Sequence, residues 1–179
     1  MVDAPGIVPD DKDWTWVLER PCPECGFDAS TCQATEVAGL IEADAAAWRA
    51  LHEAGRIRPG RPDPGRWSSL EYACHVRDVY VLYDERLRLM LEQDDPLYPN
   101  WDQDATAAAE RYDEQDPEEV IVALERAASA IAARFATIDG ATWQRVGRRS
   151  DGASFTIDTF ARYLVHDPIH HRGDVERPA

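Results

Sequence analysis

Three of the five histidines in this chain lie within six consecutive positions, at His166, His170 and His171. In a helix, His166 and His170 are one turn apart and share a face, so both imidazoles can reach one metal ion. His75 lies in a distant segment with helical periodicity and can complete a set of three ligands. The alternative is a polar helix end that happens to be rich in histidine. The spacing predicts a metal site at His75, His166 and His170.

Pro168 lies between the two histidines of the predicted pair. Proline has no amide hydrogen to donate inside a helix, and its ring crowds the carbonyl one turn earlier, so we expect the helix to kink or restart there. A kink would change which side chains reach the metal. Asp167 and His171 form an alternate pair, because they have the same spacing and divalent metals accept a carboxylate.

A site of this kind points to catalysis by a divalent transition metal, and we expect zinc or nickel because both accept imidazole ligands. Three protein ligands leave coordination positions open, which is the arrangement of a catalytic site. Such a metal lowers the pKa of a bound water or thiol and so provides a nucleophile near neutral pH. Asp78 and Asp167 are candidates for fixing the imidazole tautomers; the alternative is that they are solvated helix acids.

A second group of metal-ligand residue types lies near the N-terminus, in the run Cys22-Pro-Glu-Cys25-Gly. A Cys-x-x-Cys pair followed by glycine is typical of half a zinc knuckle, and Cys32 offers a third thiolate. A matching second half at ribbon-like spacing is missing. Free thiols packed in a loop, a metal site and a redox pair therefore all stay open, although no βαβ pattern surrounds the motif.

Composition excludes several classes of function. The chain has 34 acidic and 19 basic residues, for a net charge of −15, so phosphate backbones and anionic membranes would repel it. No apolar run approaches the length of a membrane span, and no signal peptide is visible, so we expect a cytoplasmic protein. The sequence also lacks a Ser-His-Asp elbow, a phosphate loop and a glycine-rich dinucleotide turn.

Hydrophobic periodicity predicts an all-α protein, a four-helix bundle with one long crossover connection. Residues 1–34 read as an N-terminal arm and residues 35–179 as the bundle. Ser68 with Glu71 forms a capping-box signature, and Asp116-Pro117 is typical of a helix start. We expect His52, near a helix end, to be solvated rather than a ligand. The expected elements are helices at residues 35–54, 68–92 and 116–140 and from 156 onward, a connection at 93–115, and a short hairpin around 150–152.

With these helices placed, the chain resembles the DinB/YfiT-like superfamily. The resemblance rests on residues 67–75, on His166-Asp167-Pro-Ile-His170-His171, and on Trp101-Asp102 and Tyr112 between them. It implies a four-helix bundle whose metal is held mainly by three histidines, one from the second helix and two from the last. It also implies kinship with enzymes that use the thiols mycothiol or bacillithiol, such as maleylpyruvate isomerase and S-transferases.

These observations together lead us to expect a metal-dependent enzyme that activates a thiol or water against a small-molecule substrate. The alternative is a metal-binding or stress-response bundle without catalysis. We expect a low-molecular-weight thiol as a candidate cofactor and a homodimer as a candidate assembly.

Overall fold

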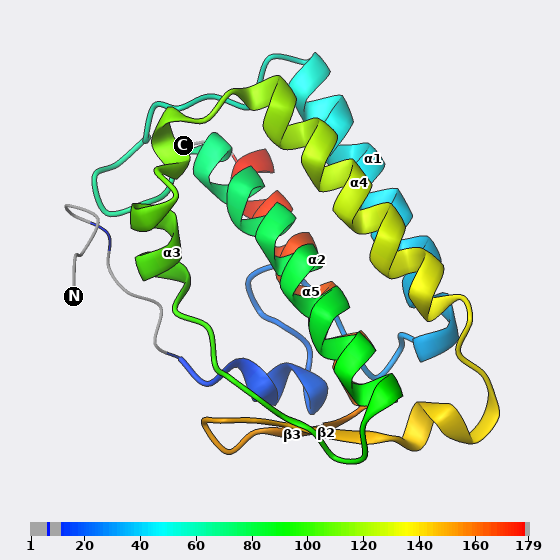
Figure 1. Cartoon of the computed structure of the whole chain (residues 1–179). Coiled ribbons are helices and arrows are strands. Elements are labelled where there is room, and N and C mark those ends of the chain that lie inside the picture. The colour runs from blue at the N-terminus through cyan, green and yellow to red at the C-terminus, as the bar shows by residue number, and fades with distance from the viewer. Residues whose placement is uncertain (1–6, 8–11, 178–179) are drawn as a thin grey trace.

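The computed structural model describes residue 7 and residues 12–177, and its main feature is a bundle of four long helices (Figure 1). Each of α1 and α2 packs against both α4 and α5, so α1 lies diagonally across the bundle from α2, and α4 lies diagonally across from α5. The predicted all-α bundle is confirmed. The four helices are α1 (Val37–Glu53), α2 (Ser69–Glu92), α4 (Pro117–Phe135) and α5 (Ile157–Glu176).

The helix starts follow the signals in the sequence. Ser68 accepts a hydrogen bond from the Glu71 amide while Glu71 reaches back to the Ser68 amide, which closes the predicted capping box of α2. Asp116 caps α4, with Pro117 at its first position. The end of α4 was predicted too late: the helix stops at Phe135, and a short 3-10 helix (Gly140–Gln144) follows.

The long connection after α2 carries β1 (Leu97–Tyr98), α3 (Gln103–Ala109) and a 3-10 turn (Tyr112–Glu114). The expected hairpin is present as β2 (Val146–Arg149) and β3 (Ser154–Thr156), paired antiparallel with Gly147 opposite Phe155. The sequence did not indicate β1, which pairs parallel with β2 through Leu97 opposite Arg148. The three strands form a small sheet at one end of the bundle (Figure 1).

The N-terminal arm docks onto the bundle through a 3-10 helix (Trp14–Leu18) that packs against α5. Val17 is fully buried there, so apolar burial helps to hold the arm on the bundle. A second 3-10 turn (Ala34–Glu36) leads into α1. Residues 1–6 and 8–11 of the expected arm lie outside the described residues. None of the described helices combines the length and apolar character needed to cross a membrane.

Helix α5 carries most of the candidate site residues, so its course and rotation decide where they lie. It continues without interruption through Pro168, so the expected restart of the helix at this residue is wrong. On the α1 side, Arg172 pairs with the buried Asp44 at 3.0 Å, and Tyr80 of α2 donates a hydrogen bond to the same carboxylate at 3.0 Å. The rotation of α5 in the bundle is thereby fixed by polar contacts as well as by apolar packing.

Candidate metal centre

Helix α5 carries two pairs of ligand residues that are offset by one position. His166 and His170 form one pair, and Asp167 and His171 form the other. Because a helix turns about 100° per residue, the two pairs face different neighbours. Asp167 and His171 lie with His75 of α2, and the ligand atoms of these three residues are all within 4.8 Å of one another. We call this group the α2–α5 site.

The expected set of His75, His166 and His170 is therefore divided. His75 lies with the alternate residues Asp167 and His171, whereas His166 and His170 lie with Cys22 and Cys25 of the arm. The physical reason is the rotation of α5 about its own axis, which turns Asp167 and His171 toward His75 and turns His166 and His170 toward the arm. Metal binding at either group stays a prediction.

The spacing of the α2–α5 site suits one metal ion. Asp167 Oδ1 lies 3.1 Å from His75 Nε2 and 3.8 Å from His171 Nε2. Ligands at the usual zinc distances in a tetrahedral arrangement are about 3.4 Å apart, a value that these two separations bracket. Small side-chain adjustments would therefore bring all three atoms to a shared ion.

The charge of this site is set by Asp167. Burial alone would raise the pKa of this carboxyl, but the charge of His75 and the hydrogen bond with it hold the pKa well below its usual value. Asp167 is consequently ionised at neutral pH, which is the form that binds a metal.

His171 is oriented by a carboxylate behind it. Its Nδ1 lies 3.1 Å from Asp174 Oδ2, so the ring can present Nε2 to the site and donate from Nδ1 to Asp174. Burial alone would raise the pKa of Asp174, but hydrogen bonding to His171 and its charge lower it. The ring of His171 also stacks on Tyr72, with centroids 5.0 Å apart. Asp174 was not predicted as a site residue from the sequence, although its position one turn after His171 was a usable signal.

His75 is fully buried and held between aromatic rings. Trp101, from the long connection, stacks on it with centroids 5.2 Å apart and an interplanar angle of 7°, and Trp67 lies 5.2 Å away on α2's N-terminal side. His75 Nδ1 is buried and makes no hydrogen bond within the part of the chain that the structure describes. The ring thus has its only described polar contact at Nε2, which is the atom that faces Asp167 and His171.

A cavity of about 1040 Å³ opens onto the α2–α5 site. The long connection and the hairpin turn help to form it, through residues such as Trp101 and Asp151. Two guanidinium groups also line it. Arg149 pairs with Asp151 at 2.9 Å, and Arg86 is almost completely buried with its Nη2 donating to the Pro99 carbonyl at 2.8 Å. Burial lowers the pKa of Arg86.

Two other residues considered in the sequence have ordinary structural roles. Asp78, a candidate for fixing an imidazole tautomer, instead accepts hydrogen bonds from Arg77 and Tyr112. His52 lies in the last turn of α1 and pairs with Glu118 at 2.8 Å on the surface, in agreement with the expectation that it is no ligand.

The four cysteines have three different environments. Cys74 is fully buried, and burial raises the pKa of its thiol to about 12, so it is an inert core residue. Cys32 is half-buried and donates only to the Gln33 carbonyl within the described residues. Cys22 and Cys25 lie beside His166 and His170.

Comparison with known proteins gives one family and one solved fold. Residues 58–175 match the family model of the DinB superfamily. The structure is similar to that of YfiT from Bacillus subtilis, described as a probable metal-dependent hydrolase with an unusual four-helix bundle topology. The TM-score is 0.64 at 17% identity, over 84% of this chain and 86% of that one. No curated protein matches the sequence.

Proposed function

The chain belongs to the DinB superfamily, and we propose that it is a metal-dependent hydrolase of a small molecule, with the metal held at the α2–α5 site. The observation that carries the proposal is the convergence of His75, Asp167 and His171 within 4.8 Å beside a large cavity. The description of YfiT as a probable metal-dependent hydrolase supports the same reaction class. Zinc or nickel fits this donor set through its imidazoles, and two histidines with one carboxylate equally suit iron(II).

Each residue of the site has a defined task. With a metal bound, His75 would release the Nε2 proton that it donates to Asp167, so that His75 and His171 would both present Nε2 lone pairs and the ionised Asp167 would supply the negative charge that a divalent cation favours. Asp174 holds His171 in the tautomer with the proton on Nδ1 and the lone pair on Nε2. A bound metal lowers the pKa of a water ligand and polarises a substrate carbonyl or phosphoryl group. Trp67 and Trp101 shield His75 from solvent, which strengthens electrostatic interactions at the site.

The cavity also indicates a class of substrate. Arg86 and Arg149 line the same space as Asp167 and His171. Guanidinium groups bind carboxylates and phosphates through two parallel hydrogen bonds. A substrate with an anionic group would therefore be positioned by the arginines while its reactive group lies at the metal.

A low-molecular-weight thiol is a second candidate nucleophile. Three protein ligands leave positions open that sulfur can occupy as well as oxygen, and the arginines of the cavity offer partners for the polar groups of a thiol cofactor. The non-catalytic alternative is less well supported, because a purely structural metal needs no cavity of about 1040 Å³ beside it.

Elemental analysis combined with activity assays tests the proposal. His75→Ala and His171→Ala should each lose a metal equivalent and all hydrolysis of an ester and phosphoester panel. The matched control His52→Ala, at the surface ion pair with Glu118, should keep both. If the protein consumes mycothiol or bacillithiol with monochlorobimane in a metal-dependent way and hydrolyses no ester or phosphoester, the nucleophile is a thiol rather than water. Full metal content in both site variants would refute the α2–α5 site.

A further inference from the structure

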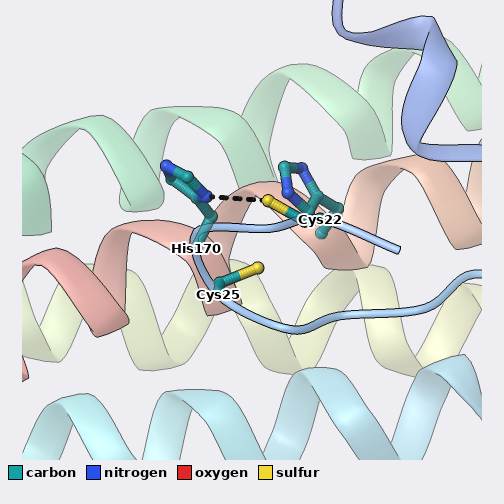
Figure 2. Close-up of side chains that lie close together, drawn as sticks. Cys22, Cys25 and His170 are labelled. Carbon is teal, nitrogen blue, oxygen red and sulfur yellow. Dashed lines mark hydrogen bonds between the residues drawn. The ribbon is translucent and has the colours of Figure 1, made fainter. Parts of the chain in front are cut away.

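A second cluster of metal-ligand atoms joins the N-terminal arm to α5. Cys22, Cys25, His166 and His170 each offer one ligand atom, and these four atoms all lie within 4.8 Å of one another. The loop that carries both cysteines passes directly beside the helix that carries His170 (Figure 2). Two residues separate the cysteines and three separate the histidines, the spacing found in zinc sites with two cysteines and two histidines.

The cluster is largely buried. Cys22, His166 and His170 are 1%, 4% and 6% exposed and Cys25 is half-buried, while His166 and His170 also line the cavity that opens onto the α2–α5 site. Trp14 covers both imidazoles, with ring centroids 5.4 Å from His166 and 5.2 Å from His170, and Phe27 lies 5.9 Å from His166. An apolar cover of this kind is suited to a permanent metal rather than to an exchanging substrate.

His166 provides an independent indication of a ligand. Its Nε2 is buried and makes no hydrogen bond to any residue in the described ranges. Leaving a buried polar nitrogen unsatisfied is costly, and native proteins rarely do so without a role for the atom.

The cysteine loop is already folded into a turn. The Cys22 amide donates to the Phe27 carbonyl at 2.8 Å, and the Gly26 amide donates to the Cys22 carbonyl at 2.8 Å. Gly26 adopts a φ of +77°, a left-handed conformation that glycine reaches without steric cost. The glycine after Cys25 therefore makes possible the tight turn that points both sulfurs to the same side.

His170 has a separate environment at each ring nitrogen. Its Nδ1 lies 3.7 Å from Cys22 Sγ, on the side of the cluster, as drawn in Figure 2. Its Nε2 lies 3.6 Å from Glu24 Oε2 and 3.8 Å from Asp174 Oδ2. This arrangement leaves Nδ1 for a metal and lets Nε2–H face carboxylates, as second partners of metal-binding histidines commonly do.

We propose that Cys22, Cys25, His166 and His170 form a structural zinc site that fastens the N-terminal arm to α5. On binding, the two S–H bonds break, two Zn–S and two Zn–N bonds form, and two protons pass to solvent, so the bound site is neutral overall. Four protein ligands complete the tetrahedral shell of zinc and leave no position for substrate. A redox role for the cysteines would make no use of either histidine.

This zinc site has a consequence for the cavity beside it. Trp14 and Thr15 of the arm line the cavity that opens onto the α2–α5 site. The rings of His170 and His171, one from each cluster, are only 5.4 Å apart. A metal that holds the arm in place thus also holds one wall of the proposed catalytic pocket.

Differential alkylation of the wild-type chain tests the proposal without any variant. In the zinc-loaded protein, Cys22 and Cys25 should resist iodoacetamide, whereas the half-buried Cys32 reacts and serves as internal reference. After zinc is removed with a chelator, Cys25 should react at a rate similar to that of Cys32. Peptide mass spectrometry reads each position. Equal labelling of Cys25 with and without zinc would overturn the proposal.

Cobalt substitution distinguishes the two metal sites. The wild type should bind a second cobalt equivalent with thiolate-to-cobalt charge-transfer absorption. Cys25→Ser should lose this equivalent and its absorption, and the matched arm variant Cys32→Ser should keep both. His75→Ala should keep the absorption while losing the other equivalent. If the charge-transfer absorption survives in Cys25→Ser, the zinc site is refuted. If Cys25→Ser loses a cobalt equivalent but His75→Ala loses none, the α2–α5 site is refuted and the zinc site is supported.

Discussion

Replacing Asp174 by asparagine tests how the α2–α5 site positions its ligands. The carboxylate of Asp174 lies 3.1 Å from His171 Nδ1 and receives a further contact from Arg177. Asparagine keeps the size and the acceptor oxygen but removes the charge. It can also turn its NH₂ group toward His171, which would favour the tautomer with the proton on Nε2. That tautomer cannot bind a metal through Nε2.

The expected magnitude follows from the role of such partners. Removing a carboxylate that orients a metal-binding histidine typically weakens metal affinity by about 10–100-fold. This corresponds to about 1.4–2.7 kcal/mol of binding free energy. Asp174 contacts the α2–α5 site only at His171 Nδ1, which is not the atom that would bind the metal. We therefore expect Asp174→Asn to weaken metal affinity without changing the number of metal ions bound.

A competition titration against a chromophoric chelator at fixed pH measures this effect. The affinity of interest is that of the metal equivalent that is lost in His75→Ala. Asp158→Asn is the matched control. Asp158 lies on the same helix and forms an ion pair with Arg162, and no described contact joins it to a histidine. An Asp174→Asn affinity equal to that of the control would refute the orienting role and with it our reading of His171.

Two further predictions concern stability. Burial raises the pKa of Asp44 to about 6, partly offset by Arg172, so Asp44 favours the folded state below pH 4 and this contribution is lost as pH rises through 6. Chemical denaturation of the wild type and of Asp44→Asn measures the difference between their free energies of unfolding. This difference should change by at most about 3 kcal/mol between pH 4 and pH 6, and a constant difference would contradict the raised pKa. Gly147→Ala places a Cβ 2.7 Å from Met90 Cγ and should lower the free energy of unfolding by about 1–3 kcal/mol. Gly39→Ala, where a Cβ meets nothing within 4 Å, should be neutral or stabilising, and equal effects would contradict the packing argument.

The bundle was predictable because its signals are local. Apolar residues recur every three or four positions in each long helix, and caps such as Ser68 and Asp116 mark the starts. The hairpin followed from a turn flanked by short extended runs. Strand β1 was not predictable, since two residues carry no period and Leu97 pairs with Arg148 in a distant segment. Such pairing is decided by tertiary packing rather than by neighbouring residues.

The candidate sites were predictable as residues but not as groups. His75, His166, His170 and the alternates were all identified from type and spacing. What the spacing does not contain is the rotation of α5 about its own axis, which decides which pair faces His75. The missing second half of the Cys-x-x-Cys motif has the same cause. It lies at His166 and His170, far along the chain, and only the fold brings the two halves together.

The rotation of α5 is fixed by three consecutive residues, each of which contacts a different neighbouring element. His170 faces the arm, with Nδ1 3.7 Å from Cys22. His171 faces α2, where its ring stacks on Tyr72. Arg172 faces α1, where it pairs with Asp44 at 3.0 Å. Because successive residues are about 100° apart, the three contacts surround the helix and oppose any turn of it. The two proposed metal sites therefore share one mechanical support, and loosening the arm should disturb the α2–α5 site without removing any of its candidate ligands.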